Sequence, residues 1–270
     1  MRTKVDVSVK KLCTDNASLD CISFGNGPRN LVVLPGVSLH ALTPSAAAVA
    51  AKFSAFCDDF TIYLLDHEDE LAKGATLRDV ASHMEDAVAQ LGINSCCIYG
   101  VSMGGMVAQL VAADNPQLVE ALVLCSTSAR LSSGLEEVIR QWVALAQEGD
   151  PSPLNRSFFA HIYSSEYFEK NAKAFALLEN MGTPEEMYRL IGQAEAALTL
   201  NNREVAASIT CPTMVVVPGA DKVIEPEEGL FLAQTISGST LEYFEGAPHA
   251  VYDENPAVLA KVRAFLLKEV

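Results

Sequence analysis

The stretch Cys96-Cys97-Ile98-Tyr99-Gly100-Val101-Ser102-Met103-Gly104-Gly105 is an apolar run that ends in Gly-Val-Ser-Met-Gly and passes at once into a helical pattern. This order is typical of a strand, a tight turn and a helix in direct succession, the context in which G-x-S-x-G has chemical meaning. Gly100 and Gly104 leave room for neighbouring backbone, and the turn forces Ser102 into a strained conformation. The Ser102 hydroxyl is therefore predicted to stand at the carboxyl end of a strand, where the unpaired N–H of Met103 also points.

Short apolar strands alternate with helices on both sides of this turn. Strands are predicted at 5–9, 19–24, 31–34, 60–66, 96–101, 121–125, 213–217 and 241–244, and helices at 43–57, 76–92, 103–114 and 256–268. Continuously apolar strands separated by helices favour the α/β class, with a mostly parallel sheet flanked by helices on both faces. Ligands of such sheets bind beyond the carboxyl ends of the strands, which is where Ser102 is expected.

The strand pattern is interrupted once. Between 132 and 201 helical periodicity recurs at 135–147, 165–180 and 183–198 without an intervening strand. We expect residues 132–201 to form a helical cap inserted in a core made of residues 1–131 and 202–270. Aromatic side chains of this insert are expected to pack on the sheet, and some of them to form an apolar lid over Ser102.

Composition excludes several classes of protein. The formal net charge of −15 over 270 residues argues against nucleic acid and anionic membranes as partners. The seven cysteines are scattered without C-x-x-C spacing, which argues against a disulfide framework and against a zinc site. The sequence shows no export signal and no apolar run of membrane-spanning length, so a cytoplasmic location is expected.

Two later strands are each followed by a residue that could activate a serine. Asp221 follows the strand at 213–217, and His249 follows the strand at 241–244. A serine hydroxyl needs a base to take its proton, and the base needs an acid to fix its tautomer. Glu225 and Asp253 are alternative acids, because Glu225 is close in sequence to Asp221 and Asp253 is close in sequence to His249.

The order Ser, Asp, His and the turns that carry these residues resemble the α/β-hydrolase fold, in its cap-bearing form, over nearly the whole chain. The matching motifs are Gly100-Val101-Ser102-Met103-Gly104-Gly105, Gly219-Ala220-Asp221 and Gly246-Ala247-Pro248-His249. The resemblance implies that Ser102 is the nucleophile, His249 the general base and Asp221 the acid that orients it. It also implies an oxyanion hole made by the backbone N–H groups of Val37 and Met103.

Two segments depart from the pattern of that family. Pro35-Gly36 stands where a His-Gly pair is usual, and Asp66-His67-Glu68-Asp69-Glu70 stands where many relatives carry Arg-Gly-x-Gly-x-Ser. Residues 67–70 are expected to form a polar loop after the strand at 60–66. His83, in the middle of the helix at 76–92, is expected to face solvent.

The sequence thus predicts a serine hydrolase that cleaves a carboxylic ester or related acyl substrate through an acyl-enzyme. It needs no organic cofactor and no metal, and its partner is a small acyl substrate; the sequence leaves the oligomeric state open. The same fold and triad also serve cofactor-free C–C bond hydrolysis, lyase and acyl-transfer reactions. A second alternative is a ligand-binding or sensor protein that has kept the triad without turnover.

Overall fold

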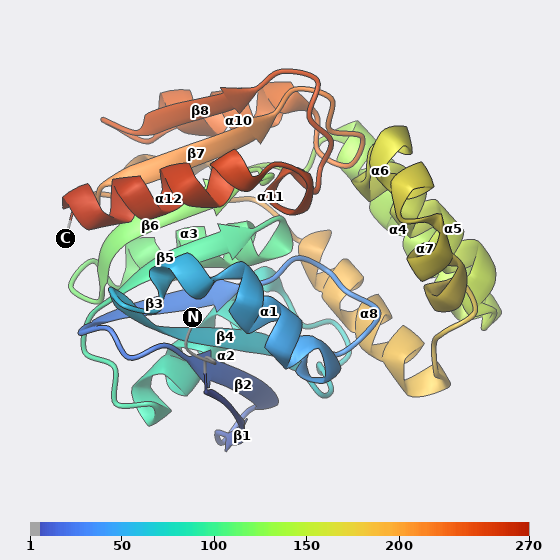
Figure 1. The fold of residues 1–270 in the computed structure, drawn as a ribbon, viewed down its shortest axis with the longest axis horizontal. Helices are drawn as coiled ribbons and strands as arrows, with labels where there is room; N and C mark the ends of the chain where they lie inside the picture. Colours follow the sequence, from blue (N-terminus) through green and yellow to red (C-terminus); the bar gives the residue numbers. More distant parts are fainter. Residues whose placement is uncertain (1–5, 270) are drawn as a thin grey trace.

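The computed structural model describes residues 6–269, and its central feature is an eight-stranded sheet in the order β1-β2-β4-β3-β5-β6-β7-β8 (Figure 1). The strands are β1 Val7–Cys13, β2 Ser18–Phe24, β3 Arg29–Leu34, β4 Phe60–Glu68, β5 Cys96–Val101, β6 Val119–Cys125, β7 Thr213–Pro218 and β8 Thr240–Phe244. The pairs β1–β2 and β2–β4 are antiparallel, and every other pair is parallel. The predicted mostly parallel sheet is confirmed.

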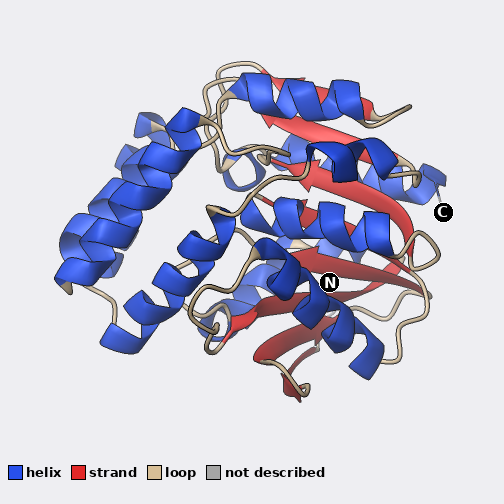
Figure 2. Ribbon diagram, turned by 180° about the vertical axis from the view of Figure 1, so that it is seen from behind, coloured by secondary structure: helices blue, strands red, loops and turns tan. Residues whose placement is uncertain are grey.

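Helices cover both faces of this sheet, and each face has its own apolar core (Figure 2). On one face lie α2 Leu77–Gln90, α3 Met103–Asp114, α9 Arg203–Ser208 and α10 Pro226–Thr235. The other face carries α1 Ala46–Lys52 and α12 Pro256–Glu269, with the short α11 Val251–Glu254 before the latter. Ten consecutive residues of α3, from Met103 to Ala112, are buried, so this helix lies inside the molecule.

Of the six helices between β6 and β7, the first five lie beyond one end of the sheet (Figure 1). They are α4 Ser133–Glu148, α5 Pro151–Ile162, α6 Ser165–Lys170, α7 Ala172–Leu178 and α8 Pro184–Ala197. An isolated antiparallel bridge between Arg130 and Asn201 brings the two ends of the segment together. We propose on this basis that residues 132–201 are a cap inserted into a core of residues 1–131 and 202–270.

Three details of the helix prediction are wrong. The single helix expected at 165–180 is divided into α6 and α7 at Asn171, whose backbone leaves the helical region. No helix was predicted at 151–162, but these residues form α5. It has Pro151 at its first position and Asp150 as N-cap, a position that proline permits. The segment 43–57 is a short 3₁₀ turn (η1 Thr43–Ser45), α1 and a second 3₁₀ turn (η2 Ser54–Phe56).

Thr43, the first residue of that segment, does not act as a helix N-cap. Its hydroxyl instead donates to Asp20 Oδ2 on β2 (3.0 Å). The helix ends early because Phe53 leaves the helical conformation, and both Phe53 and Phe56 are buried in the core on this side of the sheet. Burial of two aromatic rings outweighs continuation of a regular helix here.

Strand β4 runs two residues further than predicted. His67 and Glu68 belong to the strand and are buried, each less than 4% exposed, instead of opening a polar loop. The prediction for His83 is also wrong, because its Nδ1 lies 3.0 Å from Glu68 Oε1 and its side chain is only 15% exposed. A buried carboxylate needs a polar partner, and α2 supplies it from the helix face that packs on the sheet.

The first strand, predicted at 5–9, corresponds to β1, which begins at Val7 in the structure. Residue 5 lies outside the described residues. The cysteines are free thiols in the part of the chain that the structure describes. No helix among residues 6–269 combines the length and the apolar character that crossing a bilayer would require.

Candidate active site

The carboxyl ends of β3, β5, β6, β7 and β8 meet at one edge of the sheet, because these strands are parallel and pair in order. The loops that leave this edge contain the predicted site residues. Pro35-Gly36-Val37 follows β3, Ser102 follows β5, Asp221 follows β7 and His249 follows β8. Residues separated by more than 200 positions in the sequence are thereby brought to one place.

Ser102 lies on a strained turn between β5 and α3. Its backbone angles are φ 53° and ψ −120°, a region that residues other than glycine rarely adopt. Its N–H donates to Cys125 O (2.9 Å), and its carbonyl accepts a hydrogen bond from the Thr127 hydroxyl (2.7 Å). These contacts to the neighbouring loop hold the serine in this conformation.

The glycines of the motif are required by contact with backbone. A Cβ at Gly104 would lie 2.1 Å from the carbonyl oxygen of Leu34, and a Cβ at Gly100 would lie 2.6 Å from that of Gly104. Both distances are far below a normal contact, so larger side chains would separate α3 from the sheet. The packing of α3 against β3 and β5 thus depends on the sequence of the turn.

His249 and Asp221 form a buried pair. The Nδ1 atom of His249 lies 2.7 Å from Oδ2 of Asp221, and the two residues are 3% and 9% exposed. The other carboxylate oxygen of Asp221 accepts hydrogen bonds from the N–H groups of Val223 (2.8 Å) and Ile224 (2.9 Å). With Nδ1–H donating to the carboxylate, Nε2 of a neutral His249 is left as an acceptor, which is the state a general base needs.

The backbone of His249 is fixed as well. Ser126, the second residue with a positive φ that is not glycine, donates its hydroxyl to the carbonyl of His249 (2.7 Å). The next residue, Ala250, donates its N–H to the carbonyl of Ile162 at the end of α5 (2.9 Å). The histidine loop is therefore attached both to the sheet and to the insert.

The alternative acids lie elsewhere. Glu225 accepts a hydrogen bond from the Ser132 hydroxyl (2.6 Å), at the start of α4. Asp253 forms an ion pair with Lys52. Among residues 6–269, no cluster of three or more His, Cys, Asp or Glu side chains is arranged to hold a metal ion.

The two predicted oxyanion donors are unused by the protein itself. In the described part of the chain, no hydrogen bond involves the N–H of Val37 or that of Met103. The backbone of Gly36 passes close to the serine, since a Cβ placed on Gly36 would lie 3.5 Å from Ser102 Oγ. Unpaired backbone N–H groups near a serine hydroxyl are what an oxyanion hole requires.

His67 holds the loop that carries Val37, and this role was not predicted from the sequence. Its Nε2–H donates to the carbonyl of Gly36 (2.8 Å), and Asp66 accepts the N–H of Leu42 further along the same loop (2.7 Å). Burial lowers the pKa of His67 in spite of the carboxylates beside it, which keeps the ring neutral. The signal available in the sequence was the polar Asp66-His67-Glu68 run at the end of an apolar strand.

Helix α8 of the insert holds the same loop from the other side. Gln193 accepts the N–H of Ser38 (2.9 Å) and donates to its carbonyl (3.3 Å), and Glu186 Oε1 lies 3.1 Å from His40 Nδ1. The loop is therefore held at Gly36 by a hydrogen bond from β4 and at Ser38 by hydrogen bonds from α8.

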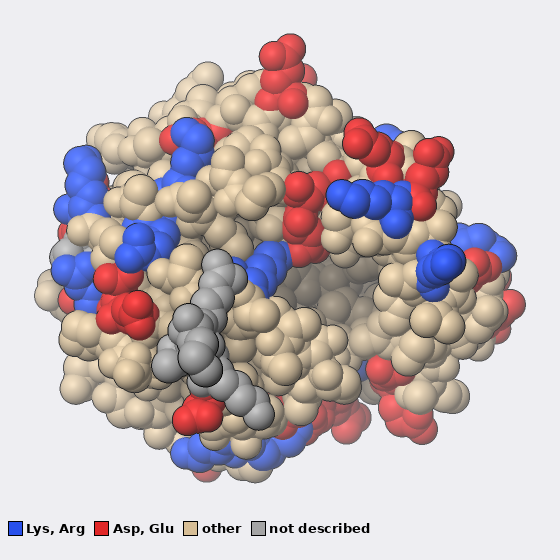
Figure 3. Space-filling view, in the orientation of Figure 1, with Lys and Arg blue, Asp and Glu red and all other residues tan. Residues whose placement is uncertain are grey.

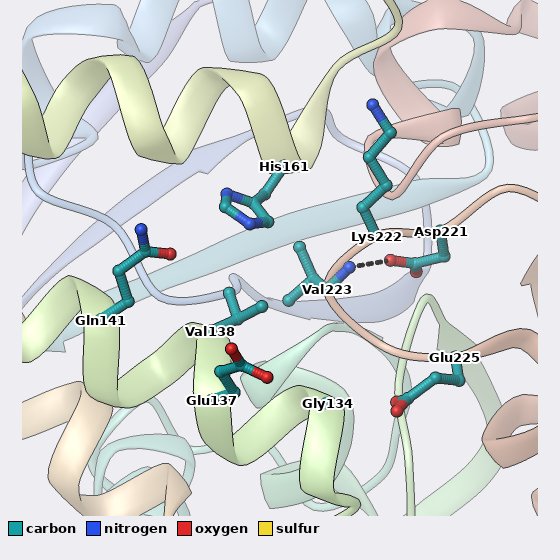
Figure 4. Close-up of a pocket in the computed structure, with 9 residues that line it drawn as sticks. All are labelled: Gly134, Glu137, Val138, Gln141, His161, Asp221, Lys222, Val223 and Glu225. Carbon is teal, nitrogen blue, oxygen red and sulfur yellow. Dashed lines mark hydrogen bonds between the residues drawn. The ribbon is translucent and has the colours of Figure 1, made fainter.

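Two cavities adjoin the site. One, of about 470 Å³, lies beside Ser102 between α1, the strands β3 to β5 and the end of α5, and Gly36, Val37 and Val101 line it. A hollow between the core and the insert, with charged side chains at its edge, is visible on this face of the molecule (Figure 3). The other cavity, of about 380 Å³, lies between the insert and the Asp221 loop (Figure 4), where polar side chains predominate.

Residues 73–256 match the serine aminopeptidase S33 family, which is more than half of the chain. The chain belongs to this family of α/β hydrolases. It is therefore an enzyme of the hydrolase class. The turn at Ser102 and the loops of Asp221 and His249 lie inside the matched region, whereas Val37 and the loop around it lie outside.

Individual relatives of the hydrolase are distant. The chain is 28% identical over 184 residues to a pimeloyl-[acyl-carrier protein] methyl ester esterase from Neisseria meningitidis, over 64% of this chain and 69% of that protein. An enol-lactonase from Burkholderia xenovorans is similar in structure (TM-score 0.84, 21% identity, 96% of this chain and 100% of that one). A hydrolase from Pseudomonas aeruginosa has a TM-score of 0.83 (24% identity, 96% and 98%). These structural likenesses show the fold.

Proposed function

We propose that this hydrolase cleaves small to medium carboxylic esters through Ser102, His249 and Asp221, with an acyl-enzyme intermediate. The observation that carries the proposal is the buried His249–Asp221 pair (2.7 Å) at the sheet edge where Ser102 occupies its strained turn. The names of the esterase and of the enol-lactonase described above support an ester-like substrate.

In the first half of the reaction, Ser102 Oγ attacks the carbonyl carbon of the ester while His249 Nε2 takes the hydroxyl proton. The electron pair of the C=O bond moves to the oxygen, where the N–H groups of Val37 and Met103 stabilise the negative charge. One such donor contributes roughly 3 kcal/mol to the lowering of the barrier. Collapse of the tetrahedral intermediate expels the alkoxide, which receives the proton from His249.

In the second half, His249 takes a proton from water, and the resulting nucleophile attacks the acyl-enzyme. The intermediate collapses, the acid is released and Ser102 recovers its proton. Asp221 keeps its negative charge throughout and stabilises the imidazolium that forms twice per cycle. The cavity beside Ser102 has mostly apolar walls and is where the acyl group is placed in this proposal.

The test is covalent labelling with a fluorophosphonate probe, with hydrolysis of p-nitrophenyl acetate measured in parallel. We expect the native protein to be labelled and to turn over the ester, and Ser102→Ala and His249→Ala each to lose about 10⁴-fold or more in kcat. Asp221→Asn should fold and lose a comparable factor, because it stabilises the wrong tautomer.

The same experiment separates the other possibilities. Labelling without ester turnover would favour C–C bond hydrolysis or acyl transfer on the same residues. A folded native protein that neither reacts with the probe nor hydrolyses the acetate would contradict the proposal and favour a binding protein. The small acetate ester matters here, because it needs little opening between the insert and the core.

A further inference from the structure

The cavity beside Ser102 has walls of two kinds. Most of its lining is apolar and comes from Val33, Val49, Phe53, Leu64, Phe158 and Ile162. A polar cluster interrupts this lining, made of Lys52 at the end of α1, Tyr99 on β5, Tyr163 after α5, and Tyr252 and Asp253 on α11. An enzyme that accepted only alkyl acyl groups would have no use for these side chains in its pocket.

The charged acceptor in this cluster, Asp253, already has a donor on each of its two oxygens. Asp253 forms an ion pair with Lys52 and accepts the hydroxyl of Tyr163 at 3.3 Å. The Lys52 ammonium also lies over the ring of Tyr252, 4.9 Å from its centre. The three donors of a lysine are not exhausted by one carboxylate, so Lys52 keeps N–H groups for a ligand.

Tyr99 is the donor with the weakest partner. Its side chain is fully buried, and in the described structure its hydroxyl makes no hydrogen bond of normal geometry. Beside it lies only the Cys125 thiol, a weak acceptor that also contacts the Ser126 hydroxyl (3.6 Å). Burial raises the pKa of Tyr99 well above its usual value, so the hydroxyl stays protonated. A buried O–H without a partner costs about 1–3 kcal/mol, which a ligand oxygen would recover.

The donors at this end of the cavity that lack a strong acceptor are therefore the Tyr99 hydroxyl and the remaining N–H groups of Lys52, and the fixed charges of Lys52 and Asp253 cancel. A carboxylate in the ligand would meet Asp253 beside Lys52, and an alkyl end would leave the Tyr99 hydroxyl unpaired. We infer that the cavity takes an acyl group with a neutral hydrogen-bond acceptor, a keto, ether or amide oxygen, at the end away from the ester. The inference rests on the proposed function, since it places the acyl group in this cavity.

The fold sets the scale of this acyl group. The Cα atoms of Tyr99 and Ser102 are three positions apart on β5 and the turn that ends it, which corresponds to about 10 Å along the strand. The tyrosine side chain projects from the strand, so its hydroxyl lies off this line. We expect a medium-length acyl chain to place its far oxygen near Tyr99 and Lys52, and the length series in the test determines the best fit.

The test compares p-nitrophenyl esters of equal length on the native protein: hexanoate, 5-oxohexanoate and the monoester of glutaric acid, with one shorter and one longer set. We expect kcat/KM for the keto ester to exceed that of the alkyl ester by about five- to ten-fold at the best length, and the carboxylate ester to be the poorest of the three.

Tyr99→Phe removes one oxygen and should reduce the keto-to-alkyl ratio of kcat/KM to about one to two. Tyr188→Phe, the same change on an exposed residue of α8, is the matched control and should keep the native ratio. Lys52→Met is a second variant and should lower the ratio as well, which keeps the test open if Tyr99→Phe fails to fold.

The outcomes distinguish the two proposals. A native protein that hydrolyses all alkyl esters with no preference for the keto esters at any length overturns the inference and leaves the proposed function standing. A preference for the carboxylate ester overturns it too. Absence of both fluorophosphonate labelling and ester hydrolysis would end the proposed function, and this inference with it.

Discussion

Ser102 shows what a single residue contributes beyond its hydroxyl. Its positive φ is unfavourable for any residue with a Cβ and costs about 1–3 kcal/mol in such a conformation. We expect Ser102→Gly to unfold at higher urea than Ser102→Ala, with a difference of about 1 kcal/mol after the greater flexibility of unfolded glycine is counted. Equal stability of the two inactive variants would mean that the turn holds little strain.

His67 is predicted to act through the peptide that it holds. In a trans peptide the C=O and N–H groups point in opposite directions, so fixing the carbonyl of Gly36 also fixes the N–H of Val37. His67→Ala should lower kcat by roughly ten- to a hundred-fold, less than the loss of an oxyanion donor, while KM for a small ester changes little.

Two further variants check this role of His67. His67→Gln has a side-chain N–H that can reach a carbonyl, so it should recover part of the lost kcat. His161→Ala removes the same side chain from α5, where Nδ1 bonds to Ser157 O (2.7 Å) and the ring packs on Trp142, without contact to the Gly36 carbonyl, and should lower kcat much less than His67→Ala does. A rise in KM with unchanged kcat in His67→Ala would contradict a role in the transition state.

At the level of elements, the contact between His83 on α2 and Glu68 on β4 makes their packing depend on pH. The hydrogen bond to Glu68, aided by the charges of Asp79 and Asp86, raises the pKa of His83 above 6.5. A raised folded-state pKa means that the stabilisation is fully present below pH 6.5 and disappears as pH rises through the folded-state value.

The comparison that isolates this effect is native protein against His83→Gln, which cannot take up the proton. Urea unfolding should show a larger stability difference between them at about pH 5.5 than at about pH 9. A difference that is constant with pH would mean that the pair contributes as a neutral hydrogen bond only.

The elements also mark where prediction from sequence succeeds and where it does not. The strands and the motif at Ser102 were predictable because each is specified by neighbouring residues. The extension of β4 through His67 and Glu68 was not, because these polar residues are buried only by virtue of partners on α2 and in the Gly36 loop. The interruption of the helix after Lys52 likewise depends on where Phe53 and Phe56 find room in the core.

For the whole molecule, the net charge of −15 predicts a stabilising effect of salt. Repulsion among excess acidic groups opposes the compact state, and added ions screen it. The ion pairs of this protein are mostly exposed and individually weak. Screening them therefore removes less stability than screening the general repulsion adds.

Raising NaCl from about 0.02 M to about 0.3 M should therefore increase the Tm by roughly 2 to 4 °C, the shift that about 1 kcal/mol produces in a chain of this size. Sodium sulfate at equal ionic strength would also strengthen the hydrophobic contribution to stability, so it is unsuitable as the only salt. A fall in Tm with NaCl would mean that the ion pairs outweigh the general repulsion.

The position of the candidate site follows from topology and was predictable, because parallel strands bring their carboxyl ends to one edge. Its supporting contacts were not. Those made by Gln193 and His67 to the loop at residues 36–38 join segments that are distant in sequence, and no spacing rule connects them. The same holds for the polar end of the cavity, where Lys52, Tyr99 and Asp253 come from three separate elements.

The bridge between Arg130 and Asn201 has a consequence for how this fold can diversify. The chain leaves and re-enters the core at adjacent points. The segment between them is therefore a loop whose ends are paired, whatever its length. Doubling such a loop costs only about 0.6 kcal/mol in closure entropy. Insertions and deletions in this segment therefore cost the sheet little, and new pockets can evolve there as long as the contacts of Gln193 with Ser38 and of Ile162 with Ala250 are retained.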